Sequence, residues 1–140
     1  MPDAFQSFRV LVVDDDVRVA DSLVQILNAT GHDAVPAYSA EAAIKLADKF
    51  NPEAVVSDVV MGPVSGIELT NYIREHYPNC RVLLFSGYAS TKAFAQAFLT
   101  RGSNVQFLPK PVHPNRILEF LATCQSSPAP VPSADETMGT

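Results

Sequence analysis

Five polar side chains that could do chemistry stand at or just after the ends of short apolar runs. They are Asp14, Asp15, Asp58, Ser86 and Lys110. Asp58 is the central one, because it ends the run Val55–Ser57 and is followed by further apolar residues. If the five side chains meet in space, they place two carboxylates, a hydroxyl and a cation around one nucleophilic carboxylate.

Such a cluster would favour phosphoryl chemistry. Carboxylates within a few ångströms of one another repel, and each raises the pKa of the others. A divalent cation relieves this repulsion, and Mg²⁺ suits such oxygen ligands because it binds through one or two carboxylates together with phosphate oxygens. Lys110 can pair with a phosphate oxygen as a compact charge, and the Ser86 hydroxyl can donate to another. Asp58 would then be a nucleophile that forms an acyl phosphate.

The apolar runs predict the strands that would carry these residues. Val10–Val13 shows no alternation of polar and apolar residues, which is typical of a strand covered on both faces in a parallel sheet. Five strands are expected, over residues 8–13, 33–37, 53–57, 81–85 and 105–108.

Helical periodicity and capping residues separate these strands. Asp16 and Ser39 are placed to cap the first two helices, and Ser65 with Glu68 has the S-x-x-E spacing of a capping box. Gly31 is expected to end the first helix in a left-handed conformation. Five helices are expected, over residues 17–30, 40–50, 66–76, 90–101 and 114–124.

Strand and helix therefore alternate five times, which indicates an α/β fold. This alternation implies right-handed crossovers and an open parallel sheet with helices on both faces. We expect a flavodoxin-like, doubly wound (βα)5 fold with strand order 2-1-3-4-5. The first, third and fourth strands are neighbours in this order, and the polar site of such sheets lies beyond the carboxyl ends of the strands.

The composition indicates one soluble globular domain. Hydrophobic residues make up 47% of the 140 positions and charged residues 18%, which fits a packed core. The net charge of −5, with no basic block, argues against direct binding of nucleic acid. We find no secretory signal and no apolar stretch near the roughly 20 residues of a membrane helix. A cytoplasmic location without a membrane partner is expected.

The ends of the chain differ from its centre. Residues 1–7 form an expected N-terminal extension, and residues 8–124 hold the predicted domain. Residues 125–140 are rich in proline and serine, and we interpret them as a disordered tail or the stub of a linker. No second folded domain fits in this tail, so the chain is either a stand-alone domain or one cut from a longer protein.

The sequence indicates neither a histidine metal site nor a nucleotide cofactor site. His32, His76 and His113 share no metal-ligand spacing and are expected at the surface or in caps. The turn after the first strand is acidic where a dinucleotide-binding fold would carry G-x-G-x-x-G, which argues against a nucleotide cofactor.

Four short motifs hold the polar residues described above, and they are Val12–Asp16, Val56–Met61, Leu84–Gly87 and Phe107–Pro111. In their order and spacing, over about residues 8–124, they resemble the motifs of the receiver domain of two-component response regulators. This resemblance implies that Asp58 is the phosphoacceptor, which takes a phosphoryl group from a histidine kinase or a phosphotransfer protein. It also implies a signalling domain that catalyses only its own phosphotransfer and dephosphorylation, and is otherwise not an enzyme.

The resemblance also implies roles for the residues around Asp58. It implies a Mg²⁺ site made by Asp14, Asp15, Asp58 and the main-chain carbonyl of Val60, with Asp15 making the main direct contact. The remaining roles are those of a phosphate-pairing lysine, a switch hydroxyl and a switch aromatic: Lys110, Ser86 and Phe107.

Three positions near the expected site distinguish this chain within the resemblance. Met61-Gly62-Pro63 stands where the family commonly has Met-Pro, so access to Asp58 is expected to differ. Phe107 stands where tyrosine is commoner. Tyr88 is bulky, and we hypothesise that it shields the phosphoryl group from water and slows its loss.

Additional apolar residues are expected on the surface around the last strand. They are Leu99 in the predicted helix 90–101, and Leu118 and Phe120 in the predicted helix 114–124. Apolar positions on neighbouring helices are typical of an association surface, and almost equally of the single exposed apolar residues that any protein surface carries. They predict a phosphorylation-dependent homodimer, or binding of a partner, through the fourth helix, the fifth strand and the fifth helix.

Two alternative functions belong to other classes. One is a HAD-like metal-dependent phosphohydrolase of similar topology. Such enzymes need a second catalytic aspartate shortly after the first, where this chain has Val60, and a segment that caps the substrate. The other is a receiver-like interaction module without phosphotransfer, which the presence of all five polar side chains argues against.

Overall fold

The structure is a computed structural model that describes residues 6–60, 65–86, 105–110 and 112–126. Its strands are β1 (Arg9–Val13), β2 (Asp33–Ala37), β3 (Ala54–Asp58), β4 (Arg81–Ser86) and β5 (Val105–Pro109). Its helices are α1 (Val17–Ala29), α2 (Ala40–Phe50), α3 (Gly66–His76) and α5 (Pro114–Ser126). The helix expected over residues 90–101 lies outside the described residues, as do Tyr88 and Met61-Gly62-Pro63. Residues 125 and 126, expected in the tail, belong to α5.

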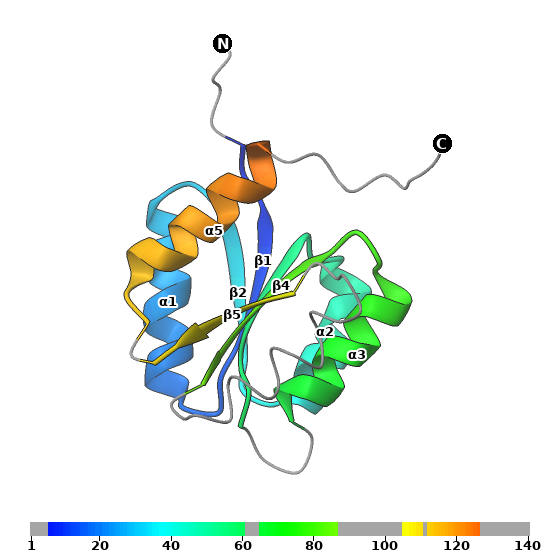
Figure 1. Ribbon diagram of the computed structural model, residues 1–140. Coiled ribbons are helices and arrows are strands. Elements are labelled where there is room, and N and C mark those ends of the chain that lie inside the picture. The colour runs from blue at the N-terminus through cyan, green and yellow to red at the C-terminus, as the bar shows by residue number, and fades with distance from the viewer. Residues whose placement is uncertain (1–5, 61–64, 87–104, 111, 127–140) are drawn as a thin grey trace, which may run out of the picture.

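The five strands form one parallel sheet in the order β2-β1-β3-β4-β5, which confirms the predicted order. Figure 1 shows α1 and α5 over one face of the sheet and α2 and α3 over the other. The expected flavodoxin-like, doubly wound architecture is therefore confirmed. Among the described residues, no helix combines the length and the apolar character needed to cross a membrane.

Each face of the sheet carries its own apolar core, and β1 and β3 contribute to both. Leu11 and Val55 belong to the core under α2 and α3, whereas Val12 and Val56 belong to the core under α1 and α5. All four are fully buried. Successive side chains of a strand point to opposite faces, so a strand covered on both faces needs an unbroken apolar run. Each such burial contributes about 1.5–3 kcal/mol, which fixes the strand ends where the polar residues lie.

Capping residues set the starts of the helices as predicted. The side chains of Asp16 and Ser39 accept main-chain N–H bonds at the starts of α1 and α2. Ser65 and Glu68 form both halves of a capping box at the start of α3. Gly31 has φ 102°, which confirms the left-handed position after α1. The cap at Asp16 matters for the site, because it begins α1 directly after Asp14 and Asp15.

The prediction that Phe120 lies on the exposed surface of α5 was wrong. This side chain is 4% exposed and belongs to the core under α1 and α5 together with Ile117 and Leu121. The spacing of three and four residues places Phe120 on the same helical face as those two residues. Leu118 packs partly against the same core, and Leu99 lies outside the described residues. The predicted association surface therefore gains no support from α5.

His32 is buried at 7% exposure, so the expectation of a surface or capping residue was wrong for it. Its Nδ1 accepts a hydrogen bond from the Phe8 main-chain N–H at 3.1 Å, and the two rings stack. Burial lowers the pKa of His32 from its ordinary value of 6.5. His113 does act as a cap, since its Nδ1 accepts the N–H of Asn115 at the start of α5.

We predict that His32 makes the fold less stable in mild acid. The unfolded chain takes up a proton on this imidazole near pH 6.5 and the folded chain resists it, so stability falls as the pH drops below that value. The slope from this group is at most about 1.4 kcal/mol per pH unit. Urea unfolding at pH 7.5 and 5.5 measures it. In His32→Asn, whose amide oxygen can accept the Phe8 N–H, the loss between the two pH values should be smaller. An equal loss in both proteins would contradict the assignment.

Candidate functional site

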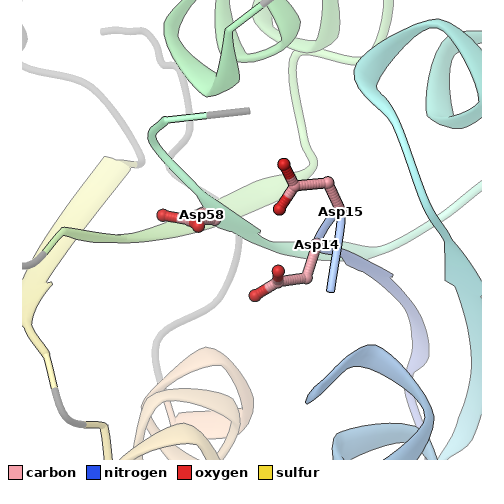
Figure 2. Close-up of side chains that lie close together, drawn as sticks. All are labelled: Asp14, Asp15 and Asp58. Carbon is pink, nitrogen blue, oxygen red and sulfur yellow. The ribbon is translucent and has the colours of Figure 1, made fainter. Parts of the chain in front are cut away.

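The carboxylates of Asp14, Asp15 and Asp58 meet at the carboxyl ends of β1 and β3 (Figure 2). One oxygen from each side chain lies within 4.8 Å of the others. Asp14 and Asp58 are buried, with 3% and 6% exposure, and Asp15 is exposed. The meeting of these strand ends, predicted from the sequence, is thus present in the structure.

The hydrogen bonds of the sheet explain why these carboxylates converge. β1 and β3 are paired up to Val13 and Ser57, so the residues that follow emerge side by side. The Asp14 N–H donates to the Ala37 carbonyl at 3.1 Å and holds the end of β1 to β2. The Asp14 Oδ1 in turn accepts the N–H of Asp16 at 2.9 Å. Main-chain bonds therefore fix the position of the most buried carboxylate.

The cluster is electrostatically unfavourable without a counter-ion. Burial raises the pKa of Asp14, and the negative charges of Asp58 and Asp15 raise it further. The hydrogen bond from Asp16 and the charge of Lys110 lower the same pKa, but the net shift is upward. Three carboxylates with an exposed side are a donor set of hard oxygens, which fits a Mg²⁺ ion.

Lys110 contacts Asp58 directly. Its Nζ donates to Asp58 Oδ2 at 3.0 Å and lies 5.7 Å from the centre of the Phe85 ring. The pairing of β4 with β5 continues to Ser86 and Pro109, which brings the next residue, Lys110, to the same edge of the sheet. The Lys110 side chain is 41% exposed. Its ammonium group can therefore exchange the Asp58 carboxylate for another anion while it stays hydrated.

The acidic cluster opens into a cleft of about 480 Å³. Its polar lining includes the three carboxylates and the side chain of Lys110. Its apolar lining is made by Val19, Leu23, Phe85 and Val112. A cleft of this size admits a phosphoryl group together with part of the molecule that donates it.

The other predicted site residues are placed less completely. Ser86 is the last residue of β4, and only its main chain is described. Phe107 in β5 is half-buried and packs against the core under α2 and α3. Val60 is 65% exposed, and its N–H makes a long bond of 3.4 Å to Asp58 Oδ1. The roles expected for Ser86, Phe107 and Val60 stay predictions.

Three residues behind Asp58 were not singled out from the sequence. Ser57 and Thr70 are buried hydroxyl residues, and Gly66 begins α3 against the Asp58 main chain. A hydroxyl inside an apolar strand was the available signal for Ser57. Nothing in the spacing of Gly66 indicates its contact with the Asp58 main chain, because that contact depends on how closely α3 approaches β3.

Comparison with known proteins gives one consistent result. Residues 10–122 match the sequence profile of the response regulator receiver domain. The chain is 32% identical over 114 residues to the response regulator protein FleR of Pseudomonas aeruginosa, and 33% identical over 103 residues to the response regulator MprA of Mycolicibacterium vanbaalenii. These matches cover 81% and 74% of this chain, but only 24% and 44% of the two relatives.

A solved structure agrees with the sequence matches. The CheY-like response regulator receiver domain protein of Methanospirillum hungatei superposes with a TM-score of 0.74 at 26% identity. The alignment covers 84% of this chain and 93% of that protein. The chain thus spans less than half the length of these two relatives and nearly all of this solved structure.

Proposed function

Because the chain belongs to the family of response regulator receiver domains, we propose that it accepts a phosphoryl group on Asp58 in a two-component system. The observation that supports this best is the placement of Asp58. Its buried carboxylate ends the central strand, lies 3.0 Å from the Lys110 ammonium and faces the carboxylates of Asp14 and Asp15. This arrangement combines a nucleophile with a phosphate-binding cation and a metal-binding pair.

In this proposal Mg²⁺ is held by Asp14, Asp15, Asp58 and the Val60 carbonyl, and the bound ion supplies charge that offsets the transferring phosphoryl group. A carboxylate oxygen of Asp58 attacks the phosphorus atom. The P–N bond of the donor phosphohistidine breaks, and the imidazole leaves with the electron pair. Lys110 moves its ammonium from the Asp58 carboxylate to a phosphoryl oxygen, which its partial exposure permits.

The new phosphate adds negative charge and acceptor oxygens at the edge of the sheet. We propose that the Ser86 hydroxyl donates to one of these oxygens and that Phe107 changes its packing in response. The signal would pass to a surface made by residues 90–101, β5 and α5, which a partner or a second copy would read. The partners are then a histidine kinase or a phosphotransfer protein in the cytoplasm, where the free thiols of Cys80 and Cys124 stay reduced.

Incubation with acetyl phosphate and Mg²⁺, followed by intact mass measurement, tests the proposal. One phosphoryl group per chain is expected, and EDTA should prevent its appearance. Steady turnover of unrelated phosphate esters would instead favour the HAD-like phosphohydrolase. An unmodified mass would favour an interaction module without phosphotransfer.

Lys110→Met is expected to slow phosphorylation by acetyl phosphate about tenfold, because it removes an ammonium group that bonds directly to the Asp58 carboxylate. Mg²⁺ should bind at least as tightly, since the competing ammonium is gone. Phosphorylation rates over a Mg²⁺ titration separate the two effects. Lys45→Met, which removes an exposed lysine of α2, is the matched control. A native rate in Lys110→Met would exclude a role for Lys110 in phosphoryl transfer.

A further inference from the structure

The main-chain carbonyl of Asp58 is in close contact with the first turn of α3. A Cβ atom placed on Gly66 would lie 2.2 Å from this oxygen, far inside van der Waals contact. The Gly66 N–H also donates to the Val59 carbonyl at 2.8 Å. The start of α3 is therefore built directly onto the residues that carry and follow the nucleophile.

Two buried hydroxyls hold the two sides of this contact. Ser57 Oγ donates to the Asp58 carbonyl at 2.9 Å, and Thr70 Oγ1 donates to the Gly66 carbonyl at 2.7 Å. The two residues are 0% and 1% exposed. A buried hydroxyl that loses its partner is costly, so each bond strongly favours one position of the carbonyl that it contacts. The hydroxyls of Ser57 and Thr70 therefore hold the main chain of Asp58 and of Gly66 where β3 meets the start of α3.

We propose that Ser57 and Thr70 are positioning residues for Asp58, a role that rests on the proposed function. The Val59 N–H is fixed to the Phe85 carbonyl at 3.0 Å, so Asp58 is held between that bond and the contact with Gly66. If Thr70 loses its hydroxyl, Gly66 and the Asp58 carbonyl can shift together. The carboxylate then moves relative to Lys110 and Asp14, and phosphoryl transfer slows.

Thr70→Val and Thr70→Ser separate the hydroxyl from the packing of the side chain. Valine keeps the shape and removes the donor, whereas serine keeps the donor. A displacement of about 1 Å can cost on the order of 100-fold in rate, so a shift of a few tenths of an ångström predicts a phosphorylation rate about five- to tenfold lower in Thr70→Val. Thr70→Ser should stay within about twofold of the native rate.

Thr123→Val is the matched control. Thr123 Oγ1 donates to the Phe120 carbonyl within α5 in a similar way, but away from Asp58. Its substitution should leave the phosphorylation rate unchanged. The NMR resonance of the Asp58 side-chain carboxyl should move in Thr70→Val and stay in place in Thr123→Val.

The outcomes distinguish this inference from the function on which it rests. A lower melting temperature of Thr70→Val with a native rate would make Thr70 merely structural and overturn the inference. A rate equally low in Thr70→Ser would do the same, because packing would then be the cause. If the native chain takes no phosphate, the proposed function fails. The inference is then tested by the Asp58 carboxyl resonance alone, and an unchanged resonance in Thr70→Val would overturn it. Should Thr70→Val not fold, Ser57→Ala removes the other hydroxyl and provides the same comparison.

Discussion

Asp58→Asn is expected to take no phosphate from acetyl phosphate or from a phosphohistidine donor, and to be more stable than the native chain. The amide keeps the shape of the side chain but is not a nucleophile. It also removes one of three neighbouring negative charges, and the charge of Asp58 is among the causes that raise the pKa of Asp14. Lys110 loses its charged partner, but 41% of its side chain is exposed and remains hydrated. We expect the free energy of unfolding to rise by about 1 kcal/mol, the energy of two unit charges roughly 4 Å apart at high dielectric.

Intact mass measurement and urea unfolding without Mg²⁺ check the two parts of this prediction separately. Asp33→Asn is the control, because Asp33 is exposed at the start of β2 and away from the acidic cluster. The control should be phosphorylated like the native chain and should not share the gain in stability. A phosphorylated Asp58→Asn would place the acceptor elsewhere. A less stable Asp58→Asn would mean that the attraction of Lys110 outweighs the repulsion within the cluster.

The fold can be predicted from the sequence because strand burial and helix capping depend on residues that are close together in the chain. The apolar run Val10–Val13 is fully buried on both faces of the sheet, and Asp16 caps α1 as expected. Parallel strands bring their carboxyl ends to one edge, so the positions of Asp14 and Asp58 follow once the strands are assigned. For these residues, local pattern and topology were sufficient.

Residues whose environment is set by distant segments could not be predicted in this way. His32 is buried because it packs against Phe8, which lies 24 residues earlier in the chain. Ser57 and Thr70 act on the two sides of a contact between β3 and α3. In each case the outcome depends on the separation of packed elements, which hydrophobic periodicity does not encode.

Gly66→Ala is the clearest test of that separation, because local and long-range effects have opposite signs there. Alanine at a helical position is normally more favourable than glycine by about 0.5–1 kcal/mol. The added Cβ would lie 2.2 Å from the Asp58 carbonyl oxygen and 3.0 Å from the Cα of Val59. Both neighbours are main-chain atoms, so α3 or the end of β3 must move. We expect a net loss of about 1–3 kcal/mol.

The same displacement should slow phosphorylation on the order of 100-fold, since a movement of about 1 Å at the nucleophile has that effect. Urea unfolding and acetyl phosphate kinetics measure the two losses. Asn71→Ala, on the exposed side of α3, reports the helix propensity alone and should keep the native rate. A Gly66→Ala variant that gains stability and keeps the native rate would mean that α3 can withdraw from β3 freely. In that case the position of Asp58 would depend on the sheet alone, and the hydroxyls of Ser57 and Thr70 would have no part in it.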